Sequence, residues 1–200
     1  MSTQSHTRQL LVNADIEGRG QGWVAIDGQR IAATGMGEAP EEWQRDARVT
    51  DLGGDLLMPG AIDVHVHFRD PGLTHKADFA TESRAAVAGG VTSVVDMPNT
   101  VPQTTTVELL RQKAEMAAGK SVANYGFFIG ATNDNLAELQ AVDPSTVAGV
   151  KLFVGSSTGN MLVDDADALD HLFATVKMPI SVHAEDEAVI ARCKTEAIAR

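Results

Sequence analysis

The sequence predicts an α/β protein in two parts, a small β domain over residues 1–59 and the first part of a (β/α)8 TIM-barrel over residues 60–200. Short strand-like runs with polar turns fill the first part. After Pro59, apolar runs alternate with amphipathic helical segments, as in a parallel sheet covered by helices. No glycine-rich nucleotide fingerprint follows the first of these strands, and polar residues gather at the strands' carboxyl ends. Both observations favour a barrel over a doubly wound sheet.

The barrel is predicted to be truncated after about five βα units. A complete barrel has eight units and about 250 residues, and the last helix-like segment is still continuing at Arg200. We therefore expect the 200 residues to be the N-terminal part of a longer protein and to be inactive alone. Five of eight strands would leave two unpaired sheet edges, which favours self-association into a homo-oligomer or aggregate.

The elements of the small β domain are short. Strand-like segments are expected at residues 9–13, 22–35 and 48–60. Within the second segment, Asp27-Gly28 stands between apolar runs, and Asp-Gly in that position indicates a hairpin turn.

The barrel part begins with a strand at residues 61–68 and a helix that ends at Gly89-Gly90, as many helices do. Two later helices show an apolar face at helical spacing, which we expect to pack on the sheet. These faces are Val107, Leu110, Ala114 and Ala117 in one helix and Leu169, Leu172, Phe173 and Val176 in the other. Further strands are expected at 91–98, 122–130, 149–155 and 179–183, with further helices around 136–142 and 185–200.

Composition and charge exclude several classes of function. The chain has 27 acidic and 16 basic side chains and a formal charge of -11, so no nucleic-acid surface is expected. The single cysteine, Cys193, excludes a disulfide framework, indicates a reducing compartment and is expected to be a packing residue. No run approaches the roughly 20 apolar residues of a membrane helix. We expect a cytoplasmic protein that acts on a small-molecule substrate.

The first barrel strand carries the strongest chemical signal, because its polar residues occupy every second position. Two imidazoles at i and i+2 near a strand's carboxyl end can bind one metal ion, although paired histidines also occur on half-exposed strands. We expect this strand to be buried on both faces, where imidazoles need partners. One face has Asp63, His65, His67 and Arg69, and the face toward the covering helices has Ile62, Val64, Val66 and Phe68.

Two later strands add candidates at the same end of the sheet. Lys151 lies in an apolar run, on the same face as Phe153. A buried ammonium is costly, so Lys151 is expected to be paired, deprotonated or converted to a carbamate, whose two oxygens suit two metal ions. The plainer alternative is a lysine that snorkels at the strand's end. His183 lies on the same strand face as Ser181 and is by itself typical of a hydrogen-bonded core histidine. Together with the histidines of the first strand, however, Lys151 and His183 indicate a site at one end of the barrel.

The segments MPGAIDVHVHFRDPG, VVDMPNT, GVKLFVGSSTGNM and SVHAED together resemble the amidohydrolase superfamily and, within it, the dihydroorotases. This resemblance implies a small β domain beside a (β/α)8 barrel that holds one or two divalent metal ions, usually zinc. It implies that His65 and His67 ligate one metal, that His183 ligates the other and that carboxylated Lys151 bridges them. It also assigns Arg69 and Asn99 to the substrate carboxylate, which suits a guanidinium fork and an amide donor.

The reaction implied by the resemblance interconverts N-carbamoyl-aspartate and dihydroorotate in pyrimidine biosynthesis. A metal pair lowers the pKa of a bridging water and polarises the ring carbonyl, and an acid/base group then carries the proton to the leaving nitrogen. In the family that group is an aspartate on strand eight, and a further histidine ligand comes from strand six. Neither strand is in these 200 residues, so the catalytic acid/base is expected beyond Arg200.

Two other functions stay open. Allantoinases and dihydropyrimidinases are similar cyclic-amide hydrolases, but allantoinases usually have an acidic residue where Arg69 stands, which favours a substrate with a carboxylate. A non-catalytic, dihydroorotase-like partner of a carbamoyltransferase is the third alternative, although such proteins commonly lose metal ligands.

The remaining polar residues have plainer interpretations. We expect Asp63 and Asp96 to have structural or ligand-supporting roles. The segment GSSTGN, residues 155–160, lacks the Gly-Lys-Ser/Thr of a phosphate loop and is expected to be a flexible loop beside the site. Three histidines are not expected to be ligands: His6, His75 and His171.

Overall fold

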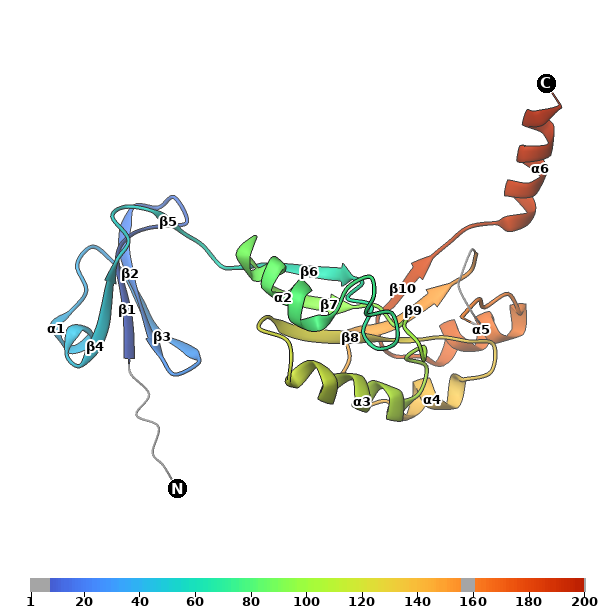
Figure 1. The fold of residues 1–200 in the computed structure, drawn as a ribbon, viewed down its shortest axis with the longest axis horizontal. Coiled ribbons are helices and arrows are strands. Elements are labelled where there is room, and N and C mark those ends of the chain that lie inside the picture. The colour runs from blue at the N-terminus through green and yellow to red at the C-terminus, as the bar shows by residue number, and fades with distance from the viewer. Residues whose placement is uncertain (1–7, 156–160, 200) are drawn as a thin grey trace. The chain divides into compact units, whose positions relative to one another are not determined.

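A computed structural model describes residues 8–155 and 161–199 (Figure 1). The chain divides into two units, Met1–Pro59 and Gly60–Arg200, which are described separately below. That these units are the small β domain and the barrel part predicted from the sequence stays a prediction. No helix in the described ranges is long and apolar enough to cross a membrane.

The first unit is a mixed sheet built around its first strand. β1 pairs antiparallel with β2 and parallel with β4 and β5, and β2 pairs antiparallel with β3. The predicted hairpin turn is confirmed, because Asp27 pairs with Arg30 across a two-residue loop and Gly28 has a φ of 61°, which glycine adopts without strain. The elements are β1 (Arg8–Ile16), β2 (Gln21–Asp27), β3 (Arg30–Met36), α1 (Glu41–Gln44), β4 (Ala47–Asp51) and β5 (Leu56–Leu57).

The second unit is a parallel sheet whose strands lie in the order β10-β9-β8-β7-β6. All four strand pairs are parallel, and each strand lies beside its predecessor in the chain. The strands are β6 (Ala61–Val66), β7 (Val91–Asp96), β8 (Asn124–Gly130), β9 (Gly149–Phe153) and β10 (Ile180–His183). The helices are α2 (Phe79–Ala88), α3 (Val107–Ala118), α4 (Leu136–Ala141), α5 (Ala166–Thr175) and α6 (Glu187–Ile198).

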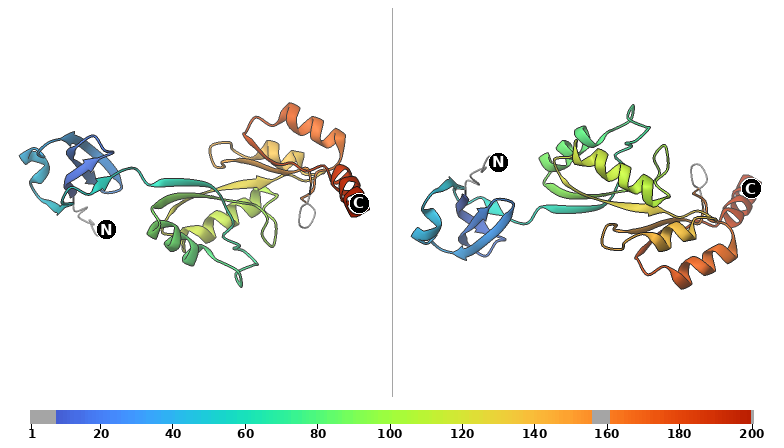
Figure 2. Two further views of the ribbon diagram at one scale, coloured as in Figure 1. Left: turned by 90° about the horizontal axis from the view of Figure 1, so that it is seen from above. Right: turned by 90° about the horizontal axis from the view of Figure 1, so that it is seen from below.

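This strand order confirms the prediction of a partial (β/α)8 barrel. A doubly wound sheet reverses its strand order at a switch point, whereas a barrel adds strands in one direction. Figure 2 shows the curl of the sheet from two further sides. α2 packs on β7 and α3 packs on β8, so each of these two helices covers the strand that follows it in the chain.

The core of the second unit lies between the sheet and its helices. Phe79, the first residue of α2, is fully buried, and its ring meets those of Phe68 at 5.8 Å and Phe127 at 6.0 Å, both edge to face. Other buried members of this cluster are Val94, Leu110, Ile129, Leu139, Val150, Leu152 and Leu172.

The expectation that β6 is buried on both faces is wrong for the described chain. Ile62 is 67% exposed and Val64 is 60% exposed, whereas Val66 and Phe68 do pack on the core. The reason is geometric. In a closed barrel whose helices each cover the strand that follows, as α2 and α3 do, the helix that covers the first strand comes from the last βα unit.

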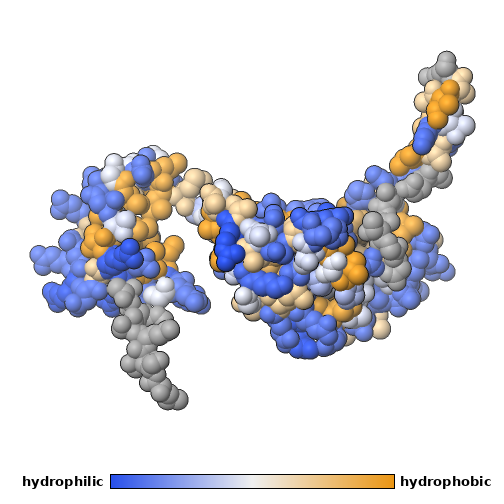
Figure 3. Space-filling view, viewed as in Figure 1, coloured by the Kyte–Doolittle hydropathy of each residue, from blue (hydrophilic) through white to orange (hydrophobic). Residues whose placement is uncertain are grey.

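Three further side chains predicted to pack are exposed. Val107 lies at the start of α3 and Phe173 on α5, and both have exposed side chains, although Leu110 and Leu172 on the same helices are buried. Cys193 on α6 is exposed, as is every described side chain of that helix. Figure 3 shows apolar residues on the surface of α6, at the upper right. A helix of this amphipathic pattern covers a core only where a partner faces it, which the periodicity alone does not reveal.

Candidate active site

His65 and His67 lie side by side at the carboxyl end of β6, with ring centroids 5.3 Å apart. The Asn99 amide oxygen, just beyond β7, lies 2.9 Å from His67 Nδ1. An amide oxygen only accepts hydrogen bonds, so Nδ1 donates and the lone pair stays on Nε2. This bond orients the ring and leaves one nitrogen available to a metal ion, as partners of metal-ligating histidines do.

The surroundings of His67 favour its neutral form. Burial lowers the pKa of the imidazole, and the positive charge of Arg69 lowers it further, although the Asn99 hydrogen bond opposes both effects. A neutral ring is the form that binds a metal ion. Asp63, expected to be structural, accepts a hydrogen bond from the His65 amide at 3.0 Å.

The chain turns sharply after His67. Arg69 has a φ of 63°, in the left-handed region that side chains rarely occupy, and it is half-buried. Its neighbour Asp70 is buried and forms an ion pair with Lys120, 2.6 Å from Nζ to Oδ2. The turn therefore places Arg69 two residues past the candidate metal ligand His67, near enough for its positive charge to lower the pKa of that imidazole.

Gly72 packs this turn against the loop after β7. It has a φ of 81°, and a Cβ on it would lie 2.0 Å from the Val101 carbonyl oxygen. We expect Gly72→Ala to destabilise the protein by about 1–3 kcal/mol, because the left-handed backbone and the backbone clash both oppose a side chain. Denaturant unfolding measures this loss. Gly53→Ala is the matched control, because Gly53 also has a positive φ but open space around its Cβ, and an equal loss in both variants would contradict the role of the clash.

Lys151 lies in the middle of β9 and is 3% exposed. Burial lowers the pKa of its ammonium group. Its Nζ lies 4.9 Å from the centroid of the Phe153 ring, which agrees with the predicted shared face. Among the residues that the structure describes, no carboxylate forms an ion pair with it, so a buried lysine stands here without a counter-charge.

His183 lies on the strand next to Lys151. In the register of β9 and β10, Ser181 pairs with Lys151 and His183 with Phe153, and the rings of Phe153 and His183 are 5.7 Å apart. His183 Nε2 is also 3.5 Å from a Glu185 oxygen. The predicted neighbours Lys151 and His183 therefore share one face of the sheet.

The structure brings the predicted residues together as two groups. His67 contacts His65 and Asn99 at the end of β6, and Lys151 and His183 are linked through Phe153 on β9 and β10. In the described ranges, no group of three or more His, Cys, Asp or Glu side chains is close enough to hold a metal ion. His75 and His171 are exposed, as are the candidate ligands His65 and His183, so the expectation that His75 and His171 are not ligands stays a prediction. His6 and residues 156–160 of the predicted loop lie outside the described ranges.

Sequence reasoning missed two lysines on or beside α3. Lys113 is buried, with its Nζ 2.6 Å from Asp96 Oδ2, and Lys120 pairs with Asp70. A signal for Lys113 was present, because it lies three residues after Leu110 and four before Ala117, on the same helical face. Lysine on an apolar face indicates a buried charge with a partner.

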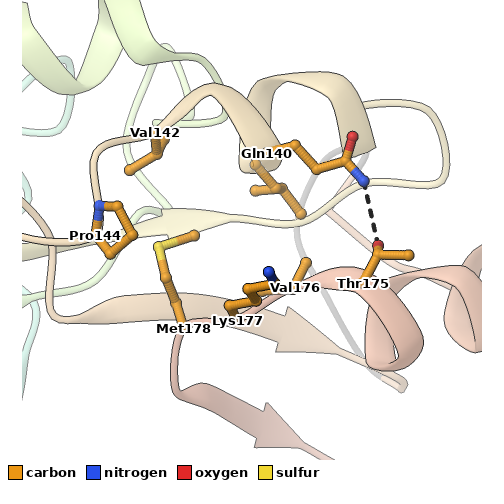
Figure 4. A pocket seen from close by; sticks show the side chains of 8 residues that line it. Gln140, Val142, Pro144, Thr175, Val176, Lys177 and Met178 are labelled. Carbon is orange, nitrogen blue, oxygen red and sulfur yellow. Dashed lines mark hydrogen bonds between the residues drawn. The ribbon is translucent and has the colours of Figure 1, made fainter.

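A cavity of about 330 Å³ lies at the other end of this sheet (Figure 4). Its walls come from the segments that precede β9 and β10, and Gln140 donates a 3.3 Å hydrogen bond to Thr175 at one side. Barrel proteins keep their chemistry at the carboxyl ends of the strands. This cavity is therefore separate from the candidate site.

The sequence profile of the amidohydrolase family matches residues 56–199. An allantoinase from Streptomyces avermitilis is 41% identical over 179 residues, which are 85% of this chain and 39% of that protein. A dihydroorotase from Halobacterium salinarum is 42% identical over 170 residues, 82% of this chain and 38% of that protein. Among solved structures, the L-hydantoinase (dihydropyrimidinase) from Arthrobacter aurescens has a TM-score of 0.82 at 26% identity, and the match covers 95% of this chain and 43% of that one.

The sequential parallel sheet, with imidazole and lysine side chains on it, places the chain among the (β/α)8-barrel proteins. The chain belongs to the amidohydrolase family. It spans about two fifths of the length of the relatives named above. The resemblance inferred from the four motifs is thus confirmed for the family, while dihydroorotases and allantoinases occur among its relatives at similar identity.

Proposed function

We propose that the protein carrying this chain is a metal-dependent cyclic-amide hydrolase, and that it is a dihydroorotase. The observation that carries the proposal is the contact of Asn99 with His67, which joins a candidate substrate-binding residue to a candidate metal ligand at 2.9 Å. Because Asn99 uses its oxygen on His67, its amide NH₂ group is free to donate to a substrate. The names of the relatives support the coarser activity.

The donor set suits divalent metal ions such as zinc. His65, His67 and His183 offer imidazole nitrogens, and the buried Lys151 without a counter-charge suits conversion to a carbamate, with two oxygens for two ions. When bound, the metal pair supplies a water of lowered pKa and polarises the ring carbonyl. Asn99 holds the His67 ring so that Nε2 presents its lone pair.

Arg69 and Asn99 bind the substrate carboxylate in this proposal. A guanidinium offers two parallel donors to a carboxylate, and the left-handed turn holds Arg69 one residue past the buried Phe68. The proton transfer to the leaving nitrogen needs an acid/base group, and a further histidine ligand is needed as well. Both are proposed to come from outside these 200 residues, in a cytoplasmic enzyme of pyrimidine biosynthesis.

Replacing Arg69 distinguishes a site for a carboxylate-bearing substrate from a site for a cyclic amide without a carboxylate. We expect Arg69→Ala in the complete protein to lower kcat/KM for dihydroorotate by about 10- to 100-fold, because a charge-assisted hydrogen bond contributes about 1.5–3 kcal/mol. Hydrolysis of a hydantoin without a carboxylate is expected to change little. Steady-state kinetics with both substrates measures the difference. Arg84→Ala, which removes an exposed arginine of α2, is the control.

An allantoinase or a hydantoinase is the second candidate, favoured by the 41% identity to the Streptomyces enzyme. In that case the complete protein hydrolyses allantoin or a hydantoin faster than dihydroorotate, and Arg69→Ala leaves the ratio of the two rates unchanged. A protein that binds metal but turns over neither substrate would instead support the non-catalytic partner of a carbamoyltransferase.

A further inference from the structure

A buried ion pair joins α3 to the end of β7. Lys113 and Asp96 are each 1% exposed, and Lys113 Nζ is 2.6 Å from Asp96 Oδ2. Nζ also donates a 2.8 Å hydrogen bond to the Met97 carbonyl oxygen and lies 5.4 Å from the centroid of the Phe127 ring. Neither side chain belongs to the proposed metal or substrate set.

Stability alone does not explain such a pair. Removing two charges from water costs about as much as their attraction returns, so apolar side chains of similar size often replace a buried pair without loss. Buried pairs are better understood through the other groups that they hold in place. For this pair, those groups are backbone atoms on both sides of His67.

The backbone on either side of His67 is bound to the end of β7. Asp96 Oδ1 accepts a hydrogen bond from the Phe68 amide at 2.8 Å, and the Met97 amide donates to the Val66 carbonyl oxygen at 3.0 Å. Lys113 binds the carboxylate of Asp96 and the carbonyl of Met97. The lysine thus fixes both residues that hold the backbone around His67.

A second lysine acts on the same turn from the end of α3. Lys120 follows the helix and forms an ion pair with the buried Asp70, the residue after Arg69. The segment from Val66 to Asp70 is therefore held at Phe68 by the Asp96 carboxylate and at Asp70 by its own carboxylate, and both carboxylates pair with lysines on or beside α3. Arg69 itself has a φ of 63°, a conformation that persists only when its surroundings hold it.

We propose that Lys113 and Asp96 are positioning residues, which set the places of His67 and Arg69 through the Phe68 amide. This inference rests on the proposed function for its effect on catalysis. Partners of this kind behind a ligand typically contribute 10–100-fold in metal affinity or activity.

Two double variants of the complete protein test the inference without leaving a lone buried charge. Lys113→Met with Asp96→Asn removes both charges but keeps a side-chain oxygen for the Phe68 amide. Lys113→Met with Asp96→Leu removes the charges and that acceptor. Leu172→Ala, which shortens a buried side chain of α5 and removes none of the contacts of this turn, is the control for general destabilisation.

Three measurements are compared at a temperature where every variant is folded: hydrogen exchange at the Phe68 amide, metal affinity by chelator competition, and the KM and kcat for dihydroorotate. We expect the leucine variant to exchange faster at Phe68 than the asparagine variant. We also expect it to lose about 10–100-fold in metal affinity and to show a raised KM. The Leu172→Ala control is expected to change neither the metal affinity nor the KM.

Equal Phe68 exchange in the two double variants would overturn the inference, and so would a loss of metal affinity that Leu172→Ala reproduces. Failure of the proposed function is a separate result. If the parent protein neither binds zinc nor turns over dihydroorotate, the exchange at Phe68 still decides whether the pair holds this turn.

Discussion

Lys151→Met in the complete protein is expected to lower kcat/KM for dihydroorotate by about a thousandfold or more without lowering the stability of the metal-free form. Metal ions contribute several kcal/mol to transition-state stabilisation, so if Lys151 is a metal ligand as proposed, losing it would remove most of the activity. Methionine is close to lysine in length and needs no counter-charge. Its sulfur can also replace the ammonium against the Phe153 ring, which Nζ faces at 4.9 Å.

A loss of activity without a loss of stability is what would identify Lys151 as functional. A lysine that only fills β9 would lose stability and activity together, since both depend on the fold. Thermal unfolding is measured after chelation, because bound metal stabilises the folded state by mass action and would obscure the comparison. Elemental analysis of the untreated protein gives the metal content per chain. Lys177→Met, which removes an exposed lysine at the other end of the sheet, is the matched control.

Dependence on bicarbonate separates a carbamate from a plain lysine ligand. A carbamate forms when a neutral amine adds carbon dioxide and releases a proton, so the chelated protein is expected to recover zinc and activity faster when bicarbonate is present. Recovery that is independent of bicarbonate would contradict carboxylation. Full activity and metal content in Lys151→Met would contradict the metal assignment altogether.

The alternation of strands and helices was readable from the sequence because it depends on local patterns. The period-two polarity of β6 placed His65 and His67 on one face, and the apolar run of β9 indicated a buried Lys151. Capping residues also mark the helix starts in the sequence, as where Asp78 accepts a hydrogen bond from the Thr81 amide.

Local patterns in the sequence did not predict which strand and helix faces are covered by other elements. Ile62 and Val64 have the pattern of a buried strand face, yet both are exposed, because the element that covers the first strand of a barrel lies far away in the chain. The hydrogen bond from His67 to Asn99 likewise joins residues 32 positions apart. No local pattern predicts such a contact, although the resemblance had named both residues.

Phe79→Ala is expected to cause the largest loss of stability among these substitutions, about 3–5 kcal/mol. The ring is fully buried, and its edge-to-face contacts with Phe68 and Phe127 are lost together with the burial. Denaturant unfolding with an unchanged m-value measures the loss. Phe79→Leu keeps most of the volume and is expected to cost less than about 1.5 kcal/mol.

The same substitution connects the core to the candidate site, because Phe68 lies between His67 and Arg69. Removing the Phe79 ring takes away the surface on which Phe68 packs, while the Asp96 hydrogen bond still holds the Phe68 amide. We therefore expect Phe79→Ala to raise the KM for dihydroorotate less than the loss of that hydrogen bond does, despite its greater effect on stability. The reverse order would mean that the packing of the Phe68 ring, rather than its backbone hydrogen bond, sets the position of Arg69.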